Sequence, residues 1–256
     1  MTENELEKYS ILTKEIGKAI IKDKFGNNTI SEYGKQLIRK RSRLVAGAIN
    51  KISKLKELIK DYKKDKHILV YAGATTVEDY DVSEDEWRQI DIITDILGNE
   101  LNMKVSQFTS KEENEEREIL KREFAIGENI QALIAIRCLD EGVNIPEIKT
   151  AFILASTTNP KEYIQRRGRV LRKAKDKDMA IIYDFVTLPR RLDEIKNLAT
   201  DEVKKDKTLV KNELNRIVDF RNSALNPMES DSLINEIKEA YDLWNNDKEE
   251  EKWNIK

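Results

Sequence analysis

The sequence predicts an α/β fold, a doubly wound and mainly parallel β-sheet flanked by helices. Between residues 67 and 185, short apolar runs of strand length alternate with segments of helical periodicity, the pattern of strands joined by crossover helices. Only nine glycines and four prolines interrupt the 256 residues, so helix should dominate elsewhere. We expect the strands at residues 67–71, 104–108, 132–136, 151–155 and 179–185.

Helical patterns also occupy both ends of the chain. Residues 4–24 carry apolar side chains at helical spacing and a turn follows at 25–28. Thr29 with Glu32 fits a capping box for a long helix that runs to Tyr62 and is weakened at Gly47. Ser83 with Glu86 fits a second box, for a helix that includes Trp87. We therefore divide the chain into a helical segment 1–66, an α/β domain 67–188 and a helical extension 189–256 with an acidic tail.

Composition excludes several classes of protein. The single cysteine, Cys138, cannot form an internal disulfide, and it suits a reducing compartment. No apolar run reaches the roughly 18 residues of a membrane helix, and the acidic N-terminus is unlike a signal peptide. We expect a cytoplasmic protein with no membrane partner. A net charge of −2 does not by itself indicate a nucleic-acid binder.

Positive charge is concentrated locally. Residues 31–66 hold twelve Lys and Arg against four Asp and Glu, most densely at Arg39, Lys40, Arg41 and Arg43. One interpretation is the solvated side of a helix that packs on the next domain. The other is a contact with the phosphate backbone of DNA.

Polar segments follow the expected strands, where functional loops of parallel sheets lie. Thr109 and Ser110 come after the second strand, at a helix N-terminus that Glu113 would complete as a capping box. Free backbone N–H groups there suit a phosphate, although simple capping explains the same residues. Residues 140–146 follow the third strand as a turn-like segment.

An arginine cluster follows the fourth strand. If residues from about Pro160 are helical, Gln165, Arg169 and Arg172 share one face at i, i+4 and i+7, and Arg166 and Arg167 turn away from it. Planar guanidinium groups at fixed spacing suit a triphosphate, and Gly168 allows close backbone approach. The alternative is a solvated basic helix turn.

At this point the sequence resembles a known family. Residues 140–146 (DEGVNIP) resemble motif V of superfamily-2 helicases, residues 165–172 (QRRGRVLR) resemble motif VI, and residues 72–76 resemble motif IV. The segment 67–185 resembles the second RecA-like domain of DEAD/DEAH-type helicases, in the restriction-subunit and DNA-repair style. One departure is Asn144, where the family usually has Asp.

The resemblance implies a RecA-like fold, ATP with Mg²⁺ that is held mainly by another domain, and nucleic acid, with double-stranded DNA expected. It makes Arg172 the arginine finger, with Arg169 on the phosphates and Gln165 organising the same surface. It gives the nucleotide side to Gly142 and Asn144. It gives nucleic-acid contact to Gly73, Thr75 and Glu141. The expected helix N-terminus would add Thr109 and Ser110 to these contacts, and the basic segment would add Arg39 and Arg41. No metal ligand is expected in this chain.

A helicase motor also needs a first RecA-like domain with a G-x-x-x-x-G-K-[ST] loop, and the sequence contains none. Gly17-Lys18 and Gly34-Lys35 are followed by Ala19 and Gln36. We therefore expect the C-terminal half of an ATP-dependent DNA helicase or translocase, completed by a first domain that would lie before Met1. Two other interpretations stay open: a non-hydrolysing RecA-like scaffold or DNA clamp, and a nucleotide-binding regulatory subunit that binds no nucleic acid.

Overall fold

The computed structural model describes residues 1–72, 76–78, 86–109, 112–136, 145–154 and 160–244 of the chain. The chain divides into two compact units, residues 42–185 and residues 1–41 together with 186–256. The six predicted site residues Gly73, Thr75, Ser110, Glu141, Gly142 and Asn144 lie outside the described residues.

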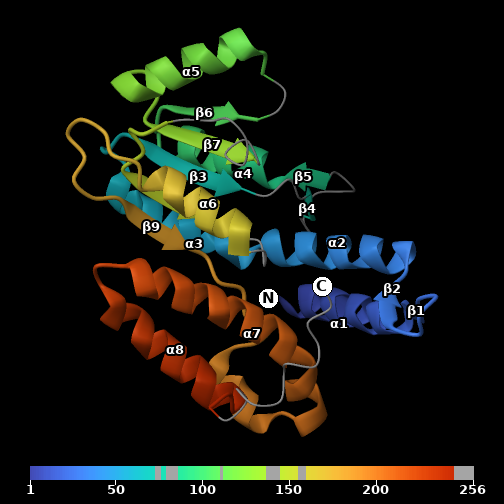
Figure 1. The fold of residues 1–256 in the computed structure, drawn as a ribbon. Helices are drawn as coiled ribbons and strands as arrows, with labels where there is room; N and C mark the ends of the chain where they lie inside the picture. The colour runs from blue at the N-terminus through green and yellow to red at the C-terminus, as the bar shows by residue number, and fades with distance from the viewer. Residues whose placement is uncertain (73–75, 79–85, 110–111, 137–144, 155–159, 245–256) are drawn as a thin grey trace. The chain divides into compact units, whose positions relative to one another are not determined.

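A five-stranded parallel sheet forms the centre of the 42–185 unit (Figure 1). Its strands are β3 (Ile68–Ala72), β6 (Val105–Phe108), β7 (Ala132–Ile136), β8 (Thr150–Ile153) and β9 (Ile181–Asp184). The spatial order is β6-β7-β3-β8-β9 and every neighbouring pair is parallel. All five residues of β3 are buried, as expected for a central strand covered on both faces. The predicted parallel α/β fold is confirmed.

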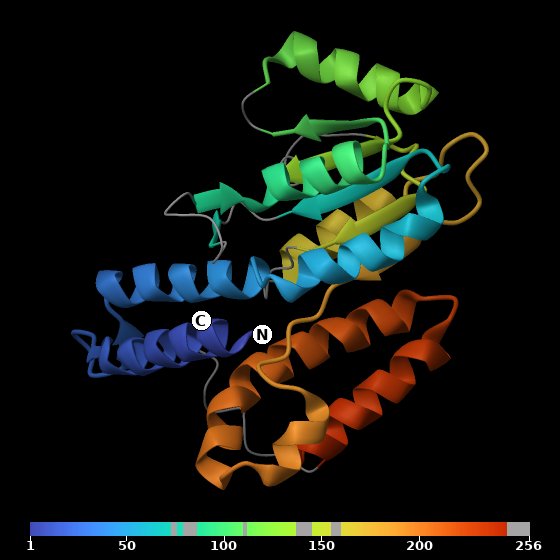
Figure 2. The same ribbon diagram turned by 180° about the vertical axis from the view of Figure 1, so that it is seen from behind.

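Helices cover both faces of this sheet. Figure 1 shows α6 (Pro160–Val170) in front of it, and Figure 2 shows α3 (Asn50–Leu58) and α4 (Gln89–Asp95) in front of the opposite face. A 3₁₀ turn, η1 (Ile59–Tyr62), extends α3, and a π-helical turn, η2 (Ile96–Glu100), extends α4. Helix α5 (Asn114–Ile126) lies beyond β6 at the edge of the sheet (Figure 1). Its left-handed cap, Gly127, has a φ of 72°.

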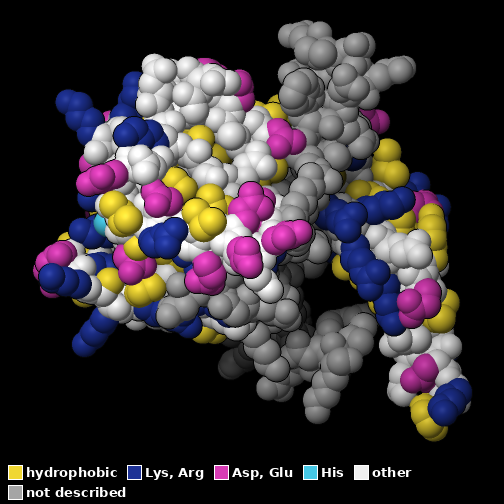
Figure 3. Space-filling view, turned by 90° about the horizontal axis from the view of Figure 1, so that it is seen from above, with side chains coloured by type: hydrophobic (Ala, Val, Ile, Leu, Met, Phe, Trp, Pro, Cys, Tyr) yellow, Lys and Arg dark blue, Asp and Glu magenta, His cyan; other side chains and the backbone are white. Residues whose placement is uncertain are grey.

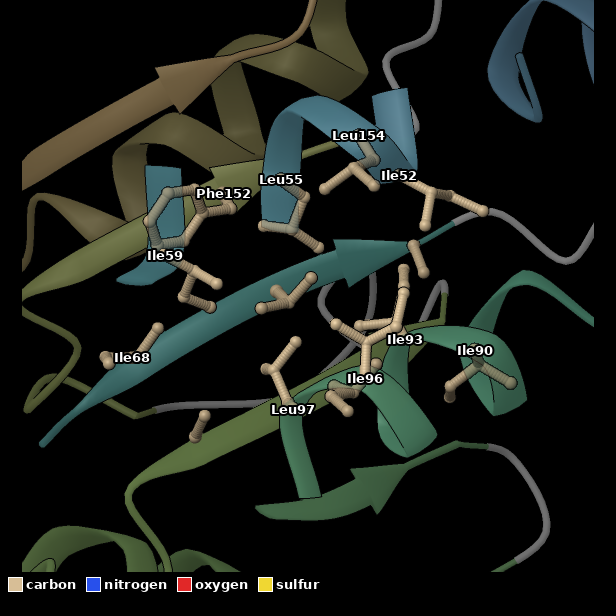
Figure 4. Close-up of a cluster of buried hydrophobic side chains, with 14 of the residues drawn as sticks. Ile52, Leu55, Ile59, Ile68, Ile90, Ile93, Ile96, Leu97, Phe152 and Leu154 are labelled. Atoms are coloured by element: carbon tan, nitrogen blue, oxygen red, sulfur yellow. The ribbon is translucent and has the colours of Figure 1, made fainter. Parts of the chain in front are cut away.

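The main core lies between the sheet and the face that α3 and α4 cover (Figure 4). Leu55 and Ile59 from α3 and η1 meet Ile93 and Leu97 from α4 and η2 over β3. Each such fully buried side chain contributes about 1.5–3 kcal/mol relative to exposure. Residues 50–62 therefore pack as part of the α/β unit, whereas the predicted division placed them in the helical segment 1–66.

The second unit is mainly helical. It contains α1 (Glu3–Lys18), the antiparallel hairpin β1 (Ile20–Lys22) and β2 (Asn28–Ile30), and the first part of α2 (Glu32–Ala46). It also contains η3 (Leu192–Asn197), α7 (Thr200–Ser223) and α8 (Pro227–Tyr241). Its core is formed by apolar side chains of η3, α7 and α8 such as Val210, Ile237 and Tyr241. Glu213 and Arg216 form a buried ion pair in this unit. The Glu213 carboxylate also accepts a hydrogen bond from the backbone N–H of Thr187 at 2.8 Å.

Several local predictions are wrong. Ile20 and Ile21 lie in a hairpin strand, where β-branched pairs are favoured, and not in an extended first helix. Ser31, not Thr29, caps α2, because its hydroxyl accepts the N–H of Gly34 at 3.1 Å. The long helix ends at Ala46, beside Gly47. Trp87 belongs to a short strand, β5 (Glu86–Arg88), that pairs with β4 (Thr76–Glu78), so the next helix begins only at Gln89.

Within the described residues, no helix combines the length and the apolar character needed to cross a bilayer.

Candidate functional site

The four strands that precede the predicted site segments end at one edge of the sheet. β3, β6, β7 and β8 are parallel, so their carboxyl ends point the same way. The segments predicted to bind nucleotide or nucleic acid follow these ends, and ligands of open α/β sheets bind at such an edge. The described part of the chain includes the strands and the residues Thr109, Gln165, Arg169 and Arg172.

Helix α6 carries most of the predicted catalytic residues. It begins at Pro160, as predicted, and presents Gln165 as exposed and Arg169 as half-buried one turn later. The helix ends at Val170, and the N–H of Arg172 lies 3.4 Å from the carbonyl oxygen of Arg169. The expected single helical face therefore holds for Gln165 and Arg169 but is wrong for Arg172. Arg172 is exposed just beyond the helix.

Arg166 has a different environment from Arg169. Only 7% of it is exposed, and its guanidinium carbon lies 4.5 Å from the centroid of the Tyr71 ring. Tyr71 belongs to β3, so Arg166 anchors α6 to the central strand by a cation–π contact. This agrees with the expectation that Arg166 turns away from the face of Gln165 and Arg169.

Lys177 was not singled out from the sequence, yet it contacts the end of α6. Its Nζ donates to the carbonyl oxygens of Pro146 at 2.9 Å, Val170 at 2.6 Å and Arg172 at 2.9 Å. Burial lowers the pKa of Lys177, and Glu147 opposes that shift. Nothing in the sequence distinguishes Lys177 from Lys173 and Lys175 nearby.

Thr109 is buried at the carboxyl end of β6, and its polar atoms are used within the chain. Its N–H and hydroxyl donate to the Glu112 carboxylate at 2.6 and 3.0 Å, and its carbonyl accepts from Nη2 of Arg117 at 2.7 Å. The capping box predicted with Glu113 is wrong, because Glu112 makes these bonds and Glu113 makes no side-chain cap bond to α5. The role of Thr109 in binding nucleic acid stays a prediction.

The two arginines predicted on α2 differ in exposure. Arg39 is exposed, as are Lys40 and Arg43. Arg41 is half-buried, donates from Nη1 to Oγ1 of Thr13 at 3.1 Å and lies 5.4 Å from the ring centroid of Tyr9. Figure 3 shows Lys and Arg side chains gathered over α2, at the right of the view.

A protein metal site is not found in the part of the chain that the structure describes. No group of three or more His, Cys, Asp or Glu side chains there could hold an ion. His67, the single histidine, is buried against α5, where its Nε2 lies 3.1 Å from the carbonyl oxygen of Ala125.

Comparison with known proteins agrees with this architecture. Residues 50–174 match the family described as the helicase conserved C-terminal domain. This part of the chain is a C-terminal RecA-like domain of superfamily-2 helicases. Over 138 residues the chain is 30% identical to DNA 3'-5' translocase XPB2 of Sulfurisphaera tokodaii, an alignment that covers 54% of this chain. The chain spans about a quarter of that relative, 26% of its length.

One solved structure shares the fold at low sequence identity, and a second is similar at a lower score. The SWI2/SNF2 ATPase core of Sulfolobus solfataricus in complex with dsDNA superimposes with a TM-score of 0.50 at 15% identity, over 80% of this chain and 48% of that one. The C-terminal part of the Fun30 ATPase domain gives a TM-score of 0.43 at 19% identity, over 80% of this chain and 72% of that one.

Proposed function

We propose that this chain supplies the second motor domain of an ATP-dependent translocase that acts on double-stranded DNA. The ATP would bind between this domain and a first RecA-like domain that the 256 residues do not include. The observation that carries the proposal is the position of α6. It follows β8 at the carboxyl edge of a parallel sheet and presents Gln165 and Arg169 in a domain of the helicase family.

The residues at this edge fit a triphosphate. Guanidinium groups are permanently charged and bind phosphate oxygens through two parallel hydrogen bonds. Beside them, an added Cβ at Gly168 would meet no described atom within 4 Å other than its chain neighbours and the backbone of its own helix, so the helix surface leaves room for a close ligand or partner. Arg169 and Arg172 would hold the phosphates from this side, while Mg²⁺, held mainly by the first domain, would neutralise phosphate charge.

Phosphoryl transfer at this site requires groups that stabilise charge more than groups that form covalent bonds. The transition state of phosphoryl transfer spreads negative charge over the γ-phosphate oxygens. A guanidinium inserted across the cleft stabilises that charge, and Arg172 is our candidate for it. Gly142 and Asn144, in the segment after β7, would line the nucleotide side.

DNA as the track is supported by the relatives and by the basic helix. The relative from Sulfurisphaera tokodaii is named a DNA translocase, and the S. solfataricus core was solved with dsDNA. In this chain, the exposed Arg39, Lys40 and Arg43 of α2 offer contacts to phosphates of the backbone. The segments that contain Gly73, Thr75 and Glu141 would contact the same DNA.

The test is single-turnover ATP hydrolysis with duplex DNA, in a motor reconstituted from this chain and a first RecA-like domain that has a phosphate-binding loop. We expect Arg172→Ala to slow hydrolysis by about 10³–10⁵-fold and to leave folding intact. Arg172→Lys should rescue poorly, because a point charge cannot reproduce the planar fork. Lys173→Ala, at an exposed neighbour, is the matched control.

Hydrolysis by Arg172→Ala within tenfold of the parent would remove the arginine finger from the proposal. If all variants bind DNA and the reconstituted motor hydrolyses no ATP, the non-hydrolysing clamp replaces the motor as the better function.

A further inference from the structure

A tight turn after α6 brings Lys177 back onto the end of that helix. Ala174 and Lys177 form an antiparallel bridge, and Asp176 between them has a φ of 61°, in the left-handed region that Asp tolerates. The turn reverses the chain within four residues. As a result the side chain of Lys177 lies beside the backbone of residues 170–172.

Each N–H donor of the Lys177 ammonium group has a carbonyl oxygen available to it. Lysine carries three N–H donors, and three carbonyl oxygens lie 2.6–2.9 Å from its Nζ. Two of them, from Val170 and Arg172, lie at the carboxyl end of α6, where carbonyls lack intrahelical partners and a positive charge is favoured by the helix dipole. The third comes from Pro146, the last residue of the sequence segment 140–146.

These contacts join two site segments that are distant in the sequence. One ends in Pro146 and contains the predicted nucleotide-side residues Gly142 and Asn144. The other is the end of α6 with Arg172. Arg172 lies two residues beyond the last helical residue. Its N–H reaches back to the carbonyl oxygen of Arg169 at 3.4 Å, and its own carbonyl oxygen accepts a hydrogen bond from Nζ of Lys177 at 2.9 Å.

We propose that Lys177 is a positioning residue for Arg172. It ties the backbone of Arg172 to the backbone of Pro146 and to the end of α6, so that the finger starts from one fixed backbone position in each cycle. The catalytic part of this inference rests on the proposed function. The structural part, that Lys177 orders residues 171 and 172, does not.

The structural part is tested on the chain alone, by amide hydrogen exchange. In Lys177→Met, the amides of Leu171 and Arg172, which face the carbonyl oxygens of Arg167 and Arg169, should exchange about tenfold faster or more. Lys175→Met removes an exposed lysine of the same loop and should leave exchange unchanged. Lys177→Gln, a polar variant that keeps two donors, should give an intermediate rate and replaces Lys177→Met if that variant does not fold. Equal exchange in the Lys177 and Lys175 variants would overturn the proposal.

The catalytic part is tested in the reconstituted two-domain motor. A displaced finger weakens only the transition state, so Lys177→Met should lower kcat about 10²-fold and keep KM for ATP within about twofold. In an Arg172→Ala background, Lys177→Met should have no further effect, because Lys177 acts through Arg172. If Lys177→Met instead damaged the fold, its loss of rate would multiply the loss caused by Arg172→Ala.

The outcomes separate the two proposals. Normal hydrolysis by Arg172→Ala removes the proposed role of the finger, and the exchange experiment still decides whether Lys177 orders the loop. If Arg172→Ala loses hydrolysis, the motor function stands. The positioning role of Lys177 is then overturned by either of two results: Lys177→Met hydrolyses ATP as fast as Lys175→Met, or the rate losses of Lys177→Met and Arg172→Ala multiply in the double variant.

Discussion

Gly168 separates Arg167 from Arg169 in α6, and the space beside it is open. Apart from its chain neighbours and the backbone of α6, no described atom would lie within 4 Å of a Cβ at this position. Gly168→Ala should therefore raise the free energy of unfolding by about 0.5–1 kcal/mol, because glycine in a helix loses more backbone entropy on folding than alanine does. In the two-domain motor, the same change should slow hydrolysis if ATP or the first domain approaches this surface.

The measurements are chemical denaturation of the chain and single-turnover hydrolysis. Gly34→Ala in α2 is the contrasting control, because its Cβ would lie 2.6 Å from Cγ2 of Ile30 and 2.8 Å from Cβ of Ala19. It should destabilise the chain. A stabilised Gly168→Ala with full hydrolysis would mean that nothing approaches α6 there.

Arg166 illustrates why motif membership and role are different. It stands within the same basic cluster as Arg169, but it is buried on the ring of Tyr71. A double-mutant cycle of Arg166→Met and Tyr71→Leu should give a coupling energy of about 0.5–2 kcal/mol in unfolding. A coupling near zero would show that burial of the arginine stem, not the ring contact, holds α6 to β3.

At the scale of elements, helix α2 carries the prediction for nucleic acid. Its exposed Arg39, Lys40 and Arg43 can each neutralise a phosphate, whereas Arg41 is engaged by Thr13 and Tyr9. Replacing the three exposed residues by Gln should reduce the slope of log affinity against log salt by about 0.9 per lost contact on duplex DNA. Arg41→Gln should act mainly on stability. The control replaces three other exposed lysines, Lys196, Lys204 and Lys205, by Gln, which removes the same amount of charge. An unchanged slope would return α2 to a solvated helix face.

The sheet was predictable from sequence because its strands are buried on both faces. Continuous apolar runs such as 68–72 and 132–136 have few alternatives in a chain with crossover helices between them. The β4–β5 pair and the hairpin before α2 were not predicted. Each has strands of three residues, and their pairing depends on neighbours that no local pattern specifies.

For the candidate site, the sequence predicted the position of α6 but not where it stops. Val170, Leu171 and Arg172 continue the helical pattern, and the helix ends because the chain turns back through the bridge between Ala174 and Lys177. Lys177 could not have been found from the sequence, because its role depends on three carbonyl oxygens, one of them from Pro146, 31 residues away. Every residue has a backbone carbonyl group, so the residue types do not show which carbonyl oxygens accept a hydrogen bond.

At the scale of the whole molecule, the chain provides only one side of the proposed ATP site. In the proposed motor Arg169 and Arg172 would bind phosphate oxygens, but no G-x-x-x-x-G-K-[ST] loop occurs in the 256 residues to cradle the triphosphate and orient Mg²⁺. An arginine finger contributes to the rate only when the phosphates are already held in line with the attacking water.

The purified chain should therefore show no ATP hydrolysis, with or without duplex DNA, even if it binds that DNA. The measurement is phosphate release at high protein concentration, with and without DNA, beside an Arg172→Ala preparation made in the same way. Any contaminating ATPase contributes equally to both preparations, so equal rates agree with the prediction. DNA-stimulated turnover that is present in the parent and absent in Arg172→Ala would contradict it. The chain would then complete an ATP site by itself, most simply by pairing two copies so that each supplies its arginines to the other.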